Sequence, residues 1–114
     1  MKNYPKHYET IIKAMEEMGL KIPEIMTAFG ELHEKSVEDG ALSSKVKELI
    51  SLGIAITVRC DGCITFHVHD ALTAGATDKE IMETIGVAIS MGGGPSVVYG
   101  SEAMEALKQF RAMV

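Results

Sequence analysis

Apolar residues along the chain recur mostly at spacings of three and four, and strand-like alternation is almost absent. Such spacing is typical of amphipathic helices. A first helix is predicted from Pro5 to Met18, with Gly19 ending it. A second is predicted from near Pro23 towards Gly40, because a proline in the first turn of a helix costs no hydrogen bond.

The middle of the chain holds the most apolar helix. The stretch KVKELISLGIAITV predicts a helix capped by Ser43 or Ser44. One apolar stripe is made of Val46, Leu49, Ile50, Gly53, Ile54 and Thr57. The second half, Leu52 to Val58, is apolar nearly all round, so we expect it to be deeply buried or to lie in a subunit interface. The RCDGC motif then breaks the pattern, and Asp61 is a suitable N-cap for a fourth helix from about Gly62 to Leu72.

Two more helices complete the predicted fold. Gly75 suits a helix C-terminus, and Thr77 with Glu80 forms a capping box at the start of a fifth helix. MGGGPS is predicted to be a flexible connection between two helices, and Pro95 begins a sixth helix that closes the chain. The sequence therefore predicts an all-α fold: a compact single domain, residues 1–114, of about six helices, in which the third and fourth form a central antiparallel hairpin around the cysteines.

Composition and charge narrow the classes of function. The 114 residues are 46% hydrophobic and 24% charged, which suits one globular core and excludes disorder. The net charge is -5 and the lysines and arginines are dispersed, so no nucleic acid partner is expected. The N-terminus has no signal-like apolar region and no window of about 18 apolar residues occurs, so we expect no membrane span and a cytoplasmic location.

The chemistry is concentrated in VRCDGCITFHVHD, residues 58–70. The two cysteines are three positions apart, so they cannot be a long-range staple. Amide groups and the dipole at a helix start favour a thiolate, and Cys63, in the first turn, is expected to receive more of that field than Cys60. His67 lies one turn after Cys63 on the same face and is the natural proton carrier.

An acidic partner for this histidine lies on the preceding helix. Glu48 is flanked by apolar residues, twelve positions before Cys60. If the two helices pack antiparallel, Glu48 falls level with His67. A partly buried carboxylate would then share a proton with the imidazole and the thiol.

The spacing of Glu48, the Cys60-Asp61-Gly62-Cys63 motif and His67 resembles the signature of alkylhydroperoxidase D-like proteins in the carboxymuconolactone decarboxylase superfamily. The stretches SSKVKELISLGIAI and HVHDALTAGATDKEIMETIGVAISMGGGPS look like the same domain, so the resemblance covers roughly residues 20 to 110. It implies an all-helical protein that assembles as a homo-oligomer, often a trimer or hexamer, and reduces hydroperoxides with an external thiol reductant.

The resemblance also implies a role for each site residue. Cys63 matches the cysteine that attacks the peroxide and becomes a sulfenic acid, and Cys60 the partner that supplies a proton and condenses with it. Glu48 and His67 match the proton relay. No metal or organic cofactor is implied, and the expected partners are a hydroperoxide or disulfide substrate and a thiol reductant of unidentified nature. The best-known members carry histidine where this chain has Gly62, which leaves the reductant and the peroxidase efficiency open.

Other interpretations remain beside the peroxidase. A zinc site on Cys60, Cys63, His67 and His69 has suitable ligand types, but on a helix the two histidines point about 200° apart. In a second alternative, both cysteines are simply small buried hydrophobes. His69 is then a capping or packing residue, and Glu48 is an exposed carboxylate. A non-catalytic redox-sensing or assembly subunit is the alternative function, whereas lactone decarboxylation is disfavoured because that branch lacks the cysteine pair. The glutamate and histidine relay favours catalysis, since a mere staple needs none.

Overall fold

The protein, as seen in a computed structural model that describes residues 2–113, is built entirely of α-helices. The six helices are α1 (Tyr4–Lys21), α2 (Pro23–Ser36), α3 (Ser44–Thr57), α4 (Asp61–Thr73), α5 (Asp78–Gly92) and α6 (Gly94–Ala112). No strand occurs within residues 2–113, so the all-α prediction is confirmed. None of these helices is long and apolar enough to cross a membrane.

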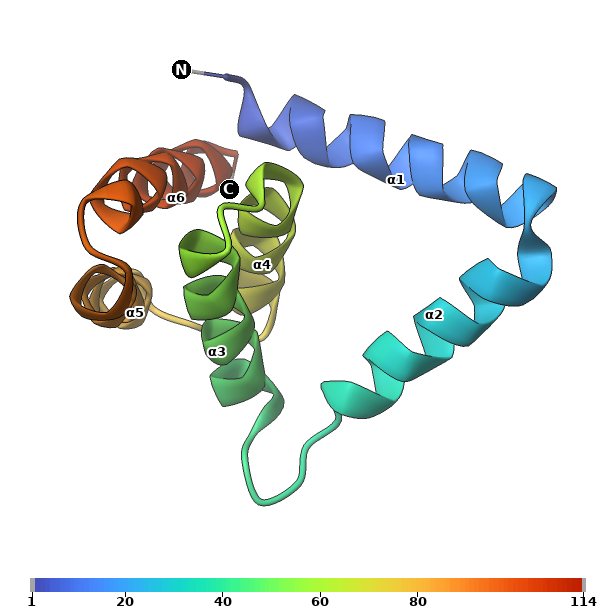
Figure 1. The fold of residues 1–114 in the computed structure, drawn as a ribbon, viewed down its shortest axis with the longest axis horizontal. Helices are drawn as coiled ribbons and strands as arrows, with labels where there is room; N and C mark the ends of the chain where they lie inside the picture. The colour runs from blue at the N-terminus through green and yellow to red at the C-terminus, as the bar shows by residue number, and fades with distance from the viewer. Residues whose placement is uncertain (1, 114) are drawn as a thin grey trace.

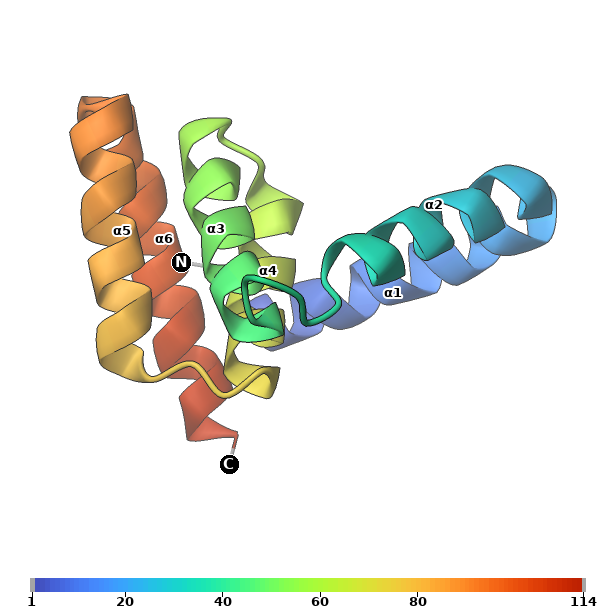
Figure 2. The ribbon, with the colours of Figure 1, turned by 90° about the horizontal axis from the view of Figure 1, so that it is seen from below.

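Helices α3 to α6 form a packed block (Figures 1 and 2). α3 and α4 are joined by a short turn and pack as the predicted central hairpin, while α5 and α6 cover them from one side. Burial of aliphatic side chains from all four helices stabilises the block. Its largest buried members include Leu52, Ile56, Ile64, Val68, Ile81, Ile85 and Leu107.

Helices α1 and α2 form a V-shaped arm that reaches away from the block (Figure 1). The arm is anchored at the start of α1, where the backbone amide of Tyr4 donates to Gln109 Oε1 over 2.7 Å and its hydroxyl donates to Glu102 Oε1 over 3.3 Å. Burial of the Tyr4 phenol, and then the adjacent Glu102 carboxylate, raise the pKa of Tyr4 well above its ordinary value. The Tyr4 side chain is therefore in its neutral, protonated form in the folded protein.

The second helix of the arm has no buried residue. The apolar side chains that recur along it, Ile25, Phe29 and Leu32, are all exposed, although the prediction of a helix here is confirmed. A short helix in water is marginal by itself and takes most of its stability from packing. Within residues 2–113, α2 packs mainly on α1, so the arm is the less supported part of the molecule.

Helix α3 has two different apolar faces. Leu52 and Ile56 are buried in the block, as expected for the apolar second half of this helix. The predicted stripe through Val46, Ile50 and Ile54 instead lies at the surface. Together with residues of α5 it lines a groove of about 460 Å³, the outer groove, whose residues are Val46, Leu49, Ile50, Gly53, Ile54, Thr57, Thr84, Val87, Ala88 and Met91.

Some predicted helix ends are wrong. Gly19 does not end the first helix, which continues to Lys21 and stops because Ile22, preceding Pro23, is driven out of the helical region. α2 ends at Ser36, before Gly40. The capping box of Thr77 and the helix-ending Gly75, at φ +95°, are both present as predicted.

Candidate active site

The cysteine pair lies at the turn between the hairpin helices. Arg59 adopts a left-handed conformation, with φ 61°, which reverses the chain between α3 and α4. Cys60 and Cys63 are joined by a disulfide, with their Cα atoms 5.1 Å apart. A single turn of chain therefore places the pair at the start of α4, where both side chains remain partly exposed.

The N-cap of α4 differs from the sequence prediction. Cys60, not Asp61, is the N-cap, and its sulfur accepts a hydrogen bond from the Cys63 amide over 3.2 Å. The Cys60 sulfur therefore caps the helix in place of the serine or aspartate oxygen that is usual at this position. The helix end acts on Cys60 as well as on Cys63, so the helix field does not by itself select the nucleophile.

The motif residues between the cysteines hold the arm to the block. Asp61 forms an ion pair with Lys2 and lies 3.5 Å from His7 Nε2, measured to Oδ2. A Cβ atom at Gly62 would lie 3.1 Å from Ile11 Cδ1, closer than side chains normally approach. A histidine here, as in the best-known members of the resembled family, would require Ile11 to move, so glycine at this position matches the close approach of α1.

Glu48 and His67 meet across the hairpin. Glu48 is 5% exposed, and its Oε1 lies 2.9 Å from His67 Nδ1. The interpretation of Glu48 as an exposed carboxylate is therefore wrong. The prediction that antiparallel packing brings Glu48 level with His67 is correct. A buried carboxylate needs a hydrogen-bonding partner. The imidazole supplies one and is itself only partly exposed, so one proton can be held between the two groups.

The arm and the block enclose a pocket beside the disulfide. The pocket, of about 400 Å³, is lined by Tyr8, Ile11, Met15, Phe29, Gly30, His33, Cys60, Gly62, Cys63, Phe66, His67 and Asp70. Most of these side chains are apolar and few polar groups interrupt them, which suits a small, largely apolar substrate. Sequence reasoning missed the arm's contribution; the only available signal was the amphipathic pattern of its two helices.

His69 leaves α4 in a different direction from His67. Its ring stacks on Tyr8, with centroids 4.1 Å apart, and its Nδ1 lies 3.0 Å from Asp70 Oδ1. Burial of Tyr8, and then the charge of Asp70, raise the pKa of Tyr8 above its ordinary value. His69 packs, as the sequence suggested, and the structure does not gather Cys60, Cys63, His67 and His69 into the zinc cage that their types allowed.

An all-helical protein with a C-x-x-C pair at a helix start, a histidine one turn further along that helix and a glutamate on the preceding helix falls in the alkylhydroperoxidase D-like class. Comparison with known families agrees. The chain belongs to the carboxymuconolactone decarboxylase family, whose family model matches residues 23–106.

Similar solved structures cover nearly the whole chain. A crystal structure of a carboxymuconolactone decarboxylase family protein from Legionella pneumophila is 38% identical and superposes with a TM-score of 0.92, covering 96% of this chain and 98% of that one. A family protein from Thermotoga maritima, described as having a suggested role in the antioxidative response, is 29% identical with a TM-score of 0.81, covering 91% and 92%. A relative from Cupriavidus necator is 38% identical over 76% of this chain and 77% of its own length.

Proposed function

We propose that the protein is a thiol-dependent alkylhydroperoxidase that reduces small organic hydroperoxides at Cys60 and Cys63. The observation that carries this proposal is the buried Glu48, hydrogen-bonded to His67 in the pocket that also contains the cysteine pair. A structural disulfide needs no acid and base beside it, whereas peroxide reduction moves protons at each step. The antioxidative role suggested for the Thermotoga maritima protein supports the same chemistry.

The reaction balances with the residues in the pocket and one external reductant. The Cys63 thiolate attacks one peroxide oxygen, so an S–O bond forms, the O–O bond breaks, and the departing alkoxide takes a proton to become an alcohol. The Cys60 sulfur then attacks the sulfenic sulfur, forming the disulfide and releasing water. Two electrons pass from the dithiol to the peroxide, and an external thiol returns them by exchange.

The proton transfers in this scheme depend on Glu48 and His67. The Glu48 carboxylate accepts a hydrogen bond from His67 Nδ1, which fixes the orientation of the ring and leaves Nε2 as its proton acceptor. The imidazole, at the pocket wall, is then able to take a proton from a thiol and deliver it to the leaving oxygen. Glu48 acts on His67 and is a positioning residue, while His67 is proposed to face the reacting atoms.

The proposal is tested by trapping the first oxidised product. Reduced wild type and Cys60→Ser are titrated with cumene hydroperoxide, and the products are identified by mass spectrometry. We expect a Cys60-Cys63 disulfide in the wild type and a sulfenic acid on Cys63 in the variant. The reciprocal variant, Cys63→Ser, is titrated in the same way. A sulfenic acid on Cys60 in that variant, with no sulfenic acid on Cys63 in Cys60→Ser, would reverse the order of attack. Unreactive thiols would overturn the peroxidase.

Replacing Glu48 separates catalysis from assembly. Glu48→Gln keeps the shape but removes the charge, so we expect the rate of disulfide formation with peroxide to fall about 100-fold or more. Stopped-flow measurement of thiol oxidation checks this, with Glu83→Gln, an exposed glutamate on α5, as the matched control. Full turnover with a changed molecular mass in Glu48→Gln would instead assign the residue to a redox-sensing or assembly subunit.

We also propose that the protein is a homo-oligomer held through the outer groove. The groove is lined almost wholly by apolar side chains, and one of them, Ile54, is 56% exposed. Contiguous exposed apolar surface of this kind marks interaction sites. Ile54→Glu is expected to shift the mass in sedimentation to that of a monomer while the helical circular dichroism is retained. An unchanged mass would place the interface elsewhere, or show that none exists.

A further inference from the structure

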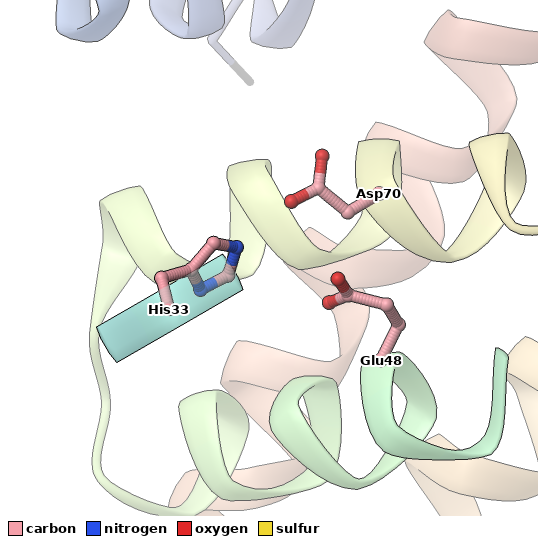
Figure 3. Close-up of side chains that lie close together, drawn as sticks. All are labelled: His33, Glu48 and Asp70. Atoms are coloured by element: carbon pink, nitrogen blue, oxygen red, sulfur yellow. The ribbon is translucent and has the colours of Figure 1, made fainter. Parts of the chain in front are cut away.

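Three potential metal ligands from three helices point into one space at the edge of the pocket. Figure 3 shows His33 of α2, Glu48 of α3 and Asp70 of α4 turned towards one another. One ligand atom from each residue lies within 4.8 Å of the other two. No resemblance or comparison suggested this grouping, since His33 lies on the arm and Asp70 outside the cysteine motif.

Two of these groups are carboxylates, and they are held in place from outside. Glu48 is bonded through Oε1 to His67, and Asp70 through Oδ1 to His69. Each carboxylate therefore retains a second oxygen and a fixed orientation, as in metal sites whose ligands are oriented by outer hydrogen bonds. Two carboxylates so close repel one another, and the repulsion grows where one is as buried as Glu48. A shared cation relieves it.

We propose that His33, Glu48 and Asp70 form a binding site for a divalent transition metal ion, of the Mn²⁺ or Zn²⁺ kind. One imidazole and two carboxylates form a donor set that such ions accept, whereas an all-oxygen set would favour Ca²⁺ or Mg²⁺. Ligand atoms around such an ion are roughly 3 to 4 Å apart, given metal–ligand distances near 2.1 Å. A shift of about 1 Å closes the site, and α2, which carries His33 and has no buried residue, is the least supported of the three helices.

The site has two consequences. A bound ion would tie the end of α2 to α3 and α4, giving the second helix of the arm an attachment to the block in addition to those made by α1. It would also draw on the negative charge of Glu48, so that the carboxylate supports His67 less as a proton acceptor and proton transfer at the cysteines slows. This second consequence rests on the proposed function, whereas the ion site itself does not.

The binding experiment uses the oxidised protein, because a disulfide removes both thiolates as competing ligands. Mn²⁺ is the main probe: its free form is counted by electron paramagnetic resonance, and it has little preference for sulfur. We expect one ion per chain in the wild type and a dissociation constant raised about 100-fold or more in His33→Ala and Asp70→Asn. Glu34→Ala, an exposed glutamate beside His33 on α2 but outside the cluster, is the matched control and should bind as the wild type does.

The outcomes divide clearly. Absence of stoichiometric binding of both Mn²⁺ and Zn²⁺ to the wild type would overturn the site, as would equal binding by His33→Ala and Glu34→Ala. The inhibitory consequence is measured separately, as the ratio of peroxide oxidation rates of the reduced protein with and without saturating Mn²⁺. This ratio should fall well below one in the wild type and stay near one in His33→Ala. If the protein is no peroxidase, the binding result stands unaffected.

Discussion

The block and the arm differ in where their apolar side chains go. In α3 to α6 the aliphatic residues converge into a core with fully buried members, and the helices support one another. In the arm, α1 contributes one buried residue and α2 contributes none. Both regions show equally regular helical patterns in the sequence. The difference teaches that a periodic apolar face reports the presence of a helix, but does not report what covers that face.

The candidate active site lies where these two regions meet. The block supplies the cysteine pair, Glu48 and His67, which need fixed positions for proton transfer. The arm supplies the opposite wall of the pocket, including Phe29 and His33. The chemical groups therefore lie on well-packed helices, and the wall facing the substrate lies on a less supported one. Such a division is common in proteins that must admit ligands.

Truncating one isoleucine in each region gives the largest expected contrast. Ile64 in α4 is fully buried, whereas Ile25 in α2 is 65% exposed. We expect Ile64→Ala to lower the free energy of unfolding by about 2 to 5 kcal/mol, and Ile25→Ala to change it by less than about 0.5 kcal/mol. Urea unfolding of the two variants checks this. A large loss in Ile25→Ala would mean that another copy of the chain covers α2.

High pH should weaken the attachment of the arm. The pKa of Tyr4 is raised in the folded state, so its buried neutral phenol contributes stability that is fully present below pH 10 and is lost as the pH rises further. The raised pKa of Tyr8 acts in the same direction. Urea unfolding is measured at several pH values above 10, and tyrosinate absorbance follows the ionisation. The free energy of unfolding should fall less steeply with pH in Tyr4→Phe than in the wild type. Equal losses would remove Tyr4 as the anchor.

Helix caps give the smallest contrast. Thr77 caps α5 in the block and Asn3 caps α1 in the arm, each accepting a backbone hydrogen bond over 3.1 Å. Thr77→Ala should lower the free energy of unfolding by about 1 kcal/mol. Asn3→Ala should fray the first turn of α1 with a smaller global effect, which hydrogen exchange at the amides of that turn would detect. Comparable global losses would show that the arm unfolds together with the block.

The sequence by itself determined the helices and the chemistry of the motif. Helix starts at Pro23, Ser43 and Thr77 depend on contacts within a few residues, so local pattern was enough to predict them. The spacing of Cys60, Cys63 and His67 likewise lies within two turns of one helix. These features, together with the family resemblance, led to the all-α fold and to the candidate redox site.

Only the tertiary structure decided the contacts between distant parts of the chain. It buried Glu48 against His67, placed the stripe through Ile54 at the surface, and brought His33 from the arm beside Asp70. These outcomes depend on which faces of different helices meet. A helical pattern along a chain cannot specify that, because every amphipathic helix offers the same kind of apolar face to any neighbour.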